Sequence, residues 1–153
     1  KIARICSILP HNRSMTPGAP FAWRTRIRFV DTDATGRIHY SSLFRHFEIA
    51  EDEFFRFLGF HTADRQPADL SYPRVHVEAD YLGPLRYDDA IAISVAVSRI
   101  GASSYTLQFH VHVEDSGDIA AKGSITVVCM STRSQKSHRL PDELRDALQR
   151  HAA

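Results

Sequence analysis

The stretch FVDTDATGRIHY, residues 29–40, places two carboxylates, Asp31 and Asp33, and one glycine between a segment with strand periodicity and a segment with helix periodicity. The unpaired backbone N–H groups at a helix N-terminus, and the positive end of the helix dipole, stabilise negative charge close to them. A carbonyl group bound at this junction would therefore meet both a carboxylate and a set of N–H donors. The stretch has the parts of an active site.

The residues on either side carry the two periodicities. Upstream, positions 23, 25, 27 and 29 are apolar or threonine and alternate with three arginines, which predicts a half-buried strand with one basic face. Downstream, apolar residues recur at positions 43, 47, 50, 54 and 58, which predicts a helix with one apolar stripe. Ser41 or Ser42 could cap the start of this helix, and Gly59 could cap its end.

The second half of the chain has the alternation of strands. This alternation runs through residues 75–81, 91–97, 105–113 and 119–130. The segments around Gly101 and Gly117 are typical of hairpin turns, and residues 141–151 add a short helical pattern. This order predicts an α+β fold in which one curved antiparallel sheet wraps around one long central helix.

Composition limits the classes of function. A length of 153 residues, with 43% apolar and 24% charged residues, fits one globular domain. The net charge of +1 favours neither nucleic-acid binding nor a membrane surface, and no apolar run approaches the roughly 18 residues of a membrane-spanning helix. Cys6 and Cys129 are expected to be unpaired thiols in a reducing compartment. We therefore expect a cytoplasmic protein.

The first 20 residues stand apart from the rest. No methionine precedes Lys1, and the apolar patch at residues 5–9 is shorter than the roughly 7 to 15 residues of a signal-peptide core. We assign residues 1–20 to an N-terminal extension, either native or added during cloning, and residues 21–153 to a single domain.

Residues 29–40, called the acidic stretch below, also resemble the aspartate motif that opens the haloacid-dehalogenase-type phosphatases. In that family the preceding strand is buried on both faces, and such strands read as continuous apolar runs. The arginines at positions 24, 26 and 28 do not fit that environment. The family also needs an acidic pair after a lysine to bind magnesium, whereas here Asp88 and Asp89 precede Lys122. We therefore set this interpretation aside.

The motifs, taken in order along the chain, resemble those of the hotdog-fold acyl-CoA thioesterases of the 4-hydroxybenzoyl-CoA thioesterase type. The acidic stretch and the helix through residues 47–51 carry most of the likeness. Further similarity lies in residues 72–75, 87–89 and 101–105, so that the resemblance covers residues 21–131. It implies a hotdog fold and the hydrolysis of an acyl-CoA thioester to a free acid and coenzyme A, with no cofactor.

The resemblance implies a role for each residue of the acidic stretch. Asp33 matches the catalytic carboxylate, which attacks the thioester carbonyl or activates a water molecule, and Asp31 is expected to fix the loop. The backbone N–H of Tyr40 matches the oxyanion donor. Gly36 would allow a close backbone approach because it has no Cβ. His39 and the Tyr40 side chain would line the path of the acyl or pantetheine group.

Other polar residues are secondary candidates. Glu48 lies on the helix where another branch of hotdog thioesterases keeps its carboxylate. Ser103 and Ser104 stand in a neutral turn where some relatives carry basic residues that hold the coenzyme A phosphates. Backbone N–H groups of such a turn can still bind phosphate, so the carrier, coenzyme A or acyl carrier protein, stays open. His110 and His112 share a strand face, but the sequence places no third ligand beside them, and no metal is expected.

The resemblance also implies a homodimer or homotetramer, because chains of this family pair through their sheets and place each active site at a subunit boundary. Two other functions stay open. One is a hotdog dehydratase or hydratase, which would need a histidine and a carboxylate on facing subunits. The other is a module that binds acyl-CoA without hydrolysing it. The sequence does not specify the acyl group.

Overall fold

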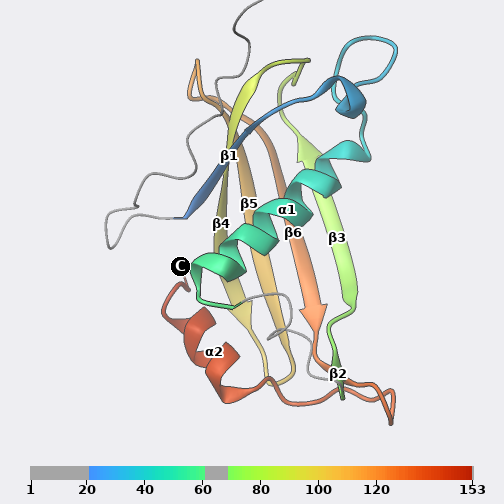
Figure 1. Cartoon of the computed structure of the whole chain (residues 1–153), viewed down its shortest axis with the longest axis vertical. Coiled ribbons are helices and arrows are strands. Elements are labelled where there is room, and N and C mark those ends of the chain that lie inside the picture. Colours follow the sequence, from blue (N-terminus) through green and yellow to red (C-terminus); the bar gives the residue numbers. More distant parts are fainter. Residues whose placement is uncertain (1–20, 61–68, 153) are drawn as a thin grey trace, which may run out of the picture.

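A computed structural model describes residues 21–60 and 69–152 (Figure 1). The main sheet contains β1 (Ala22–Arg26), β3 (Arg74–Tyr81), β4 (Ala90–Ile100), β5 (Ser104–Val113) and β6 (Ile119–Val128). These strands pair antiparallel in the order β1-β4-β5-β6-β3. A small second sheet pairs β2 (Leu70–Ser71) with β7 (Met130–Ser131). The expected extension of residues 1–20, with Cys6, lies outside the described residues.

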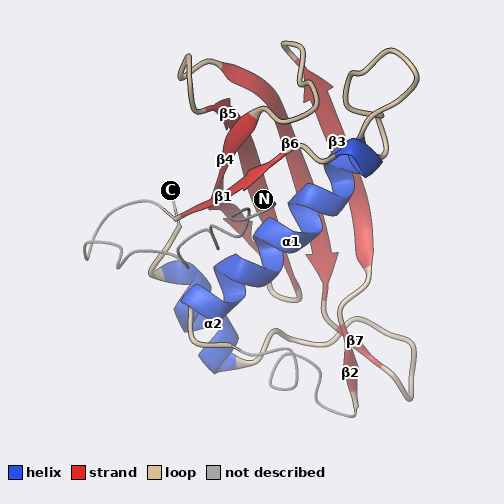
Figure 2. Ribbon diagram, turned by 45° about the horizontal axis from the view of Figure 1, so that its top comes forward, coloured by secondary structure: helices blue, strands red, loops and turns tan. Residues whose placement is uncertain are grey.

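In the described part of the chain, two α-helices accompany the sheet, and the 3-10 turn η1 (Phe29–Asp31) precedes them. The first helix, α1 (Ser42–Phe57), crosses one face of the sheet, and α2 (Asp142–Gln149) packs near the far end of β4 (Figure 2). The α+β class with an antiparallel sheet is confirmed. The helices have 16 and 8 residues, so the expectation of a single long central helix is not confirmed.

The core lies between α1 and the sheet. The helix buries an apolar stripe that includes Leu43, Phe47, Ala50 and Phe54. The ring of Phe47 stacks on Phe109 of β5, with ring centroids 4.6 Å apart. A Cβ at Gly123 of β6 would lie 2.7 Å from the Glu78 carbonyl oxygen and would also collide with the Phe47 ring. The glycine therefore lets an aromatic side chain of α1 lie flat on the sheet.

The expected alternation holds at the centre of the sheet and fails at the end of β1. Ile91, Ile93 and Val95 of β4 are all buried, as expected for a face covered by a helix. The first strand, however, ends at Arg26, and Phe29 is 81% exposed. The strand is shorter than expected because the Arg28 N–H donates to the Asp31 carboxylate at 2.8 Å, and the chain turns into η1.

The expectations on the cysteines and on membrane-spanning segments can be compared with the described residues only. Cys129 is a free cysteine, buried between β6 and β7, and burial raises the pKa of its thiol. Within residues 21–60 and 69–152, none of the helices combines the length and the apolar character that crossing a membrane requires.

Candidate active site

The loop between η1 and α1 folds back on itself, and backbone hydrogen bonds hold its shape. The Asp33 N–H donates to the Arg37 carbonyl at 2.8 Å, and the His39 N–H donates to the Asp31 carbonyl at 2.7 Å. Gly36 has a φ of +76°, a conformation that glycine adopts without strain. A Cβ at Gly36 would meet no heavy atom within 4 Å. The turn, rather than a close approach within this chain, therefore explains the glycine.

The same loop is anchored to the segment between β3 and β4. The Ile38 N–H donates to the Leu85 carbonyl at 2.8 Å, and the backbones of Arg37 and Arg86 form an isolated antiparallel bridge. Leu85 is only 1% exposed, so this anchor belongs to the core. Two segments far apart in the sequence thus hold the acidic residues in place.

The side chain of Asp33 lies at the surface, and its Oδ1 atom accepts two hydrogen bonds. The Thr35 hydroxyl and the Thr35 N–H both donate to Asp33 Oδ1, at 2.6 and 2.7 Å. These hydrogen bonds, the one from the hydroxyl above all, hold the pKa of the Asp33 carboxyl below its usual range. The Arg37 backbone N–H and the charge of the His39 imidazole lower this pKa further. Asp33 is therefore an exposed, oriented carboxylate that favours its ionised form.

Asp31 is buried, and both of its carboxylate oxygens are engaged. Oδ2 accepts from the Arg28 N–H at 2.8 Å and lies 3.2 Å from His46 Nε2. Oδ1 accepts from Arg45 Nη2 at 3.1 Å. Arg45 and His46 belong to α1, so Asp31 connects η1 to the helix. It has no free oxygen directed at a substrate.

His46 is a buried polar residue that the sequence analysis missed. Its imidazole stands on the apolar side of α1, with its ring centroid 6.0 Å from that of Trp23. Burial holds the pKa of His46 below its usual range, although the Asp31 carboxylate acts in the opposite direction. The available signal was its position, three residues after Leu43 and four before Ala50, where the apolar stripe passes.

The N-terminal corner of α1 brings together Tyr40 and His39. The Tyr40 N–H, two residues before the first helical residue, donates to no described residue. The Tyr40 carbonyl accepts from the Tyr81 hydroxyl of β3, which fixes this backbone. The His39 ring lies 4.4 Å from the Tyr40 ring, centroid to centroid, and His39 Nδ1 is 2.8 Å from Ser41 Oγ. This corner offers an unpaired donor beside two ring systems.

The remaining candidates lie elsewhere in the chain. Ser103 lies in the turn between β4 and β5, and Ser104 is the first residue of β5. The Cys129 N–H donates to the Ser103 carbonyl at 2.7 Å. The loop between η1 and α1, called the acidic loop below, lies at the other end of β4. An 11-residue strand spans about 35 Å, so one chain does not bring this turn to Asp33. Glu48 is an exposed residue of α1.

The structure describes no cluster suited to a metal ion. Within residues 21–60 and 69–152, no group of three or more His, Cys, Asp and Glu side chains is arranged to bind one. The rings of His110 and His112 lie 6.5 Å apart, centroid to centroid, on the sheet face opposite α1.

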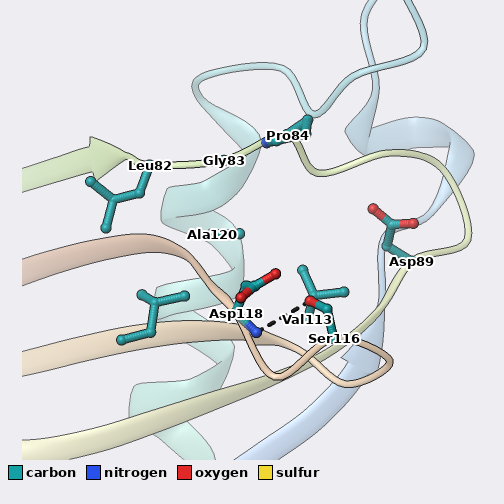
Figure 3. Close-up of a pocket in the computed structure, with 9 residues that line it drawn as sticks. Leu82, Gly83, Pro84, Asp89, Val113, Ser116, Asp118 and Ala120 are labelled. Carbon is teal, nitrogen blue, oxygen red and sulfur yellow. Dashed lines mark hydrogen bonds between the residues drawn. The ribbon is translucent and has the colours of Figure 1, made fainter.

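A hollow of about 490 Å³ lies beside the segment that follows β3 (Figure 3). The segment after β3 and the turn between β5 and β6 line it, with Pro84, Asp89 and Asp118 among its residues. None of the residues expected to act on a thioester lines this hollow. It is therefore separate from the candidate active site.

Comparison with known proteins identifies the family of the chain. A family model described as the thioesterase-like superfamily matches residues 27–148. The protein named "Putative esterase" from Aquifex aeolicus is 32% identical over 129 residues, which cover 84% of this chain and 98% of that protein. A 1,4-dihydroxy-2-naphthoyl-CoA hydrolase from Nostoc punctiforme is 27% identical over 126 residues, which cover 81% and 83%.

The fold has counterparts among solved structures. A 1,4-dihydroxy-2-naphthoyl-CoA thioesterase from Synechocystis matches with a TM-score of 0.80, covering 86% of this chain and 96% of that chain at 17% identity. At this identity the match concerns the fold alone, whereas the family model concerns the sequence. The family expected from the acidic stretch is thus confirmed: the chain belongs to the thioesterase-like superfamily, a family of hotdog-fold thioester hydrolases.

Proposed function

We propose that the protein hydrolyses an acyl-CoA thioester to a free acid and coenzyme A, with Asp33 as the catalytic carboxylate. One observation carries the proposal. Asp33 is an exposed carboxylate that Thr35 orients and whose pKa is lowered, and it lies in the same loop as the unpaired N–H of Tyr40. Asp31 and Glu48 are less suited, because Asp31 has both oxygens engaged and Glu48 stands outside the loop.

Two routes use the same groups. As a general base, Asp33 takes a proton from water, the water oxygen attacks the carbonyl carbon, and the C–S bond breaks as the thiolate leaves and is protonated. As a nucleophile, a carboxylate oxygen of Asp33 attacks the carbonyl carbon, and the C–S bond breaks as the thiolate leaves and is protonated. Water then hydrolyses the resulting anhydride to the free acid and the Asp33 carboxylate. In both routes the carbonyl oxygen becomes negative and accepts from the Tyr40 N–H. Losing one such donor costs about 2.7–4 kcal/mol in comparable sites.

The path of the substrate would involve His39 and Tyr40 of one chain and the turn with Ser103 and Ser104 of another. This division follows from the distance between the two ends of the sheet. When the sheets of two copies pair antiparallel, the turn with Ser103 of one copy would lie beside the loop with Asp33 of the other. The active site would then lie at a subunit boundary.

The edge of the sheet supports such a homodimer. β3 is an edge strand, and two of its apolar side chains are exposed, Val75 at 58% and Val77 at 43%. Pairing of β3 with β3 of a second copy would cover these side chains and satisfy the free backbone groups of the edge. We expect sedimentation to give a mass of at least twice the 17.3 kDa of one chain. A homotetramer is the larger alternative. A mass equal to that of a single chain would contradict the pairing.

The names of the relatives favour coenzyme A as the carrier and an aromatic acyl group, since the Nostoc protein is a hydrolase of 1,4-dihydroxy-2-naphthoyl-CoA. An acyl carrier protein is the alternative carrier. The exposed ring of Tyr40 and the ring of His39 offer flat contact surfaces for an aromatic group.

Release of free thiol tests the function. The wild-type protein is assayed with a thiol reagent against short, long and aromatic acyl-CoAs and against an acyl carrier protein thioester, and an enoyl-CoA is followed in parallel for hydration. We expect thiol release, fastest with an aromatic acyl-CoA. Hydration without thiol release would indicate a hydratase, and tight acyl-CoA binding without turnover would indicate a non-catalytic module.

A further inference from the structure

Among the described residues, Arg37 and Arg86 have no acidic side-chain partner. Arg37 of the loop and Arg86 of the segment between β3 and β4 face each other across an isolated antiparallel bridge. Side chains of directly opposed residues leave the ladder on the same side, with Cβ atoms about 4.5–5.5 Å apart. Both arginines are exposed, and neither side chain forms an ion pair or hydrogen bond with any described residue.

The acids that follow Arg86 are engaged by other groups. Asp89 accepts the Arg86 backbone N–H at 2.7 Å, so its carboxylate closes the turn instead of neutralising the guanidinium. Asp88 lies 3.5 Å from the guanidinium of Arg26. The local sequence therefore contains acids, but the fold directs them away from the arginine pair.

Like charges placed directly opposite each other destabilise paired backbone segments. The pair therefore gives the folded chain no electrostatic benefit until an anion binds to it. Guanidinium groups bind carboxylate and phosphate oxygens through paired N–H donors. We propose that Arg37 and Arg86 form a binding site for an oxyanion carried by the substrate, which rests on the proposed thioesterase function and adds a specificity element to it.

The position of the pair connects it to the reaction site. The Arg37 carbonyl accepts the Asp33 N–H at 2.8 Å, so the arginine and the candidate catalytic acid belong to one hydrogen-bonded turn. The turn at residues 101–104 carries no charged side chain. The oxyanion is either a phosphate of the thiol carrier or an acidic group on the acyl chain, and both present the same chemistry to the arginines.

If this site exists, substitution of either arginine should weaken anion binding without lowering the stability of the fold. Arg37→Gln and Arg86→Gln each remove one of two repelling charges, so we expect a melting temperature equal to or above that of the wild type. A pair that merely supported the fold would give a lower one. Arg133→Gln removes an exposed charge from the turn after β7 and serves as the matched control.

Calorimetric titration without turnover then separates the sources of the anion. The probes are inorganic pyrophosphate, coenzyme A, pantetheine, which has no phosphate, and phthalate, an aromatic dicarboxylate. We expect each arginine variant to bind the relevant anion about tenfold more weakly, while Arg133→Gln binds as the wild type does. Loss for pyrophosphate and coenzyme A but not pantetheine identifies a carrier phosphate, and loss for phthalate alone identifies the acyl group.

Three results would overturn the site: a wild type that binds none of these anions, unchanged binding in both arginine variants, or an equal loss in Arg133→Gln. Failure of the thioesterase function alone would leave the binding data intact, because the titration requires no hydrolysis. The two proposals can therefore fail separately.

Discussion

Asp31 and Asp33 are separated by one residue but differ in the hydrogen bonds that their carboxylates accept. Asp31 is buried and engaged by groups from η1 and α1, whereas Asp33 is exposed and engaged on one oxygen by Thr35. Asp31 thus connects η1 to α1, whereas Asp33 is a candidate catalyst. Thr35 is the residue that orients this candidate catalyst.

Thr35→Val tests that orientation. The change removes the hydroxyl that donates to Asp33 Oδ1, so the pKa of Asp33 should rise toward the usual aspartate value of 3.8. We expect kcat to fall by roughly tenfold and the acid limb of kcat/KM, measured from pH 3 to pH 8, to move to higher pH. Thr32→Val is the control, because the Thr32 hydroxyl donates to the Phe29 carbonyl instead. Equal behaviour of the two variants would refute the role of Thr35.

The acidic stretch could be predicted from the sequence because its information is local. Two acids, a glycine and a helix start within twelve residues define the loop. The partners of Asp31 could not be predicted in the same way, because His46 enters through the packing of α1 against Trp23. The opposition of Arg37 and Arg86 likewise joins segments that only the fold brings together.

At the scale of elements, an ion pair joins α1 to β3. Arg74 Nη2 lies 2.9 Å from Glu51 Oε1, and the side chains are 37% and 1% exposed. A buried carboxylate that loses its cationic partner is strongly destabilising. The pair therefore contributes to holding the helix against the edge of the sheet.

Arg74→Ala should lower the free energy of unfolding by about 3 kcal/mol, since it leaves the Glu51 carboxylate buried without the guanidinium. Urea denaturation measures the change. Arg139→Ala is the matched control, because Arg139 and Asp142 form an exposed pair on the surface, and we expect it to change stability by less than about 0.5 kcal/mol. Similar losses in both variants would contradict the structural role of the buried pair.

The elements could be predicted where periodicity and burial agree, as in β4 with its buried branched residues. The end of β1 could not, because a hydrogen bond from Arg28 to Asp31 turns the chain before Phe29 reaches the sheet. A one-sided apolar pattern also says nothing about how much of the sheet the helix covers. Val75 and Val77 alternate correctly, yet they remain exposed at the edge.

At the scale of the whole molecule, the buried His46 makes stability depend on pH. Above pH 6.5, the usual pKa of histidine, the imidazole is neutral in both the folded and the unfolded chain. As the pH falls below 6.5, the unfolded chain takes up a proton that the folded chain takes up only at lower pH. The free energy of unfolding should therefore decrease below that pH.

His46→Phe removes this part of the pH dependence. We expect the difference in unfolding free energy between pH 7.5 and pH 5 to be smaller in the variant than in the wild type, as measured by urea denaturation at both values. His138→Phe replaces an exposed histidine and is the control. An unchanged pH dependence in His46→Phe would show that the buried imidazole is not the titrating group.

The most direct measurement of the central claim is thiol release from acyl-CoA by Asp33→Asn. Asparagine keeps the shape of the side chain and removes its charge, so circular dichroism and acyl-CoA affinity should stay as in the wild type. We expect kcat to fall by roughly 10²–10⁴-fold, while Glu48→Gln on the exposed side of α1 retains activity. Unchanged turnover in Asp33→Asn, or a loss confined to Glu48→Gln, would contradict the account.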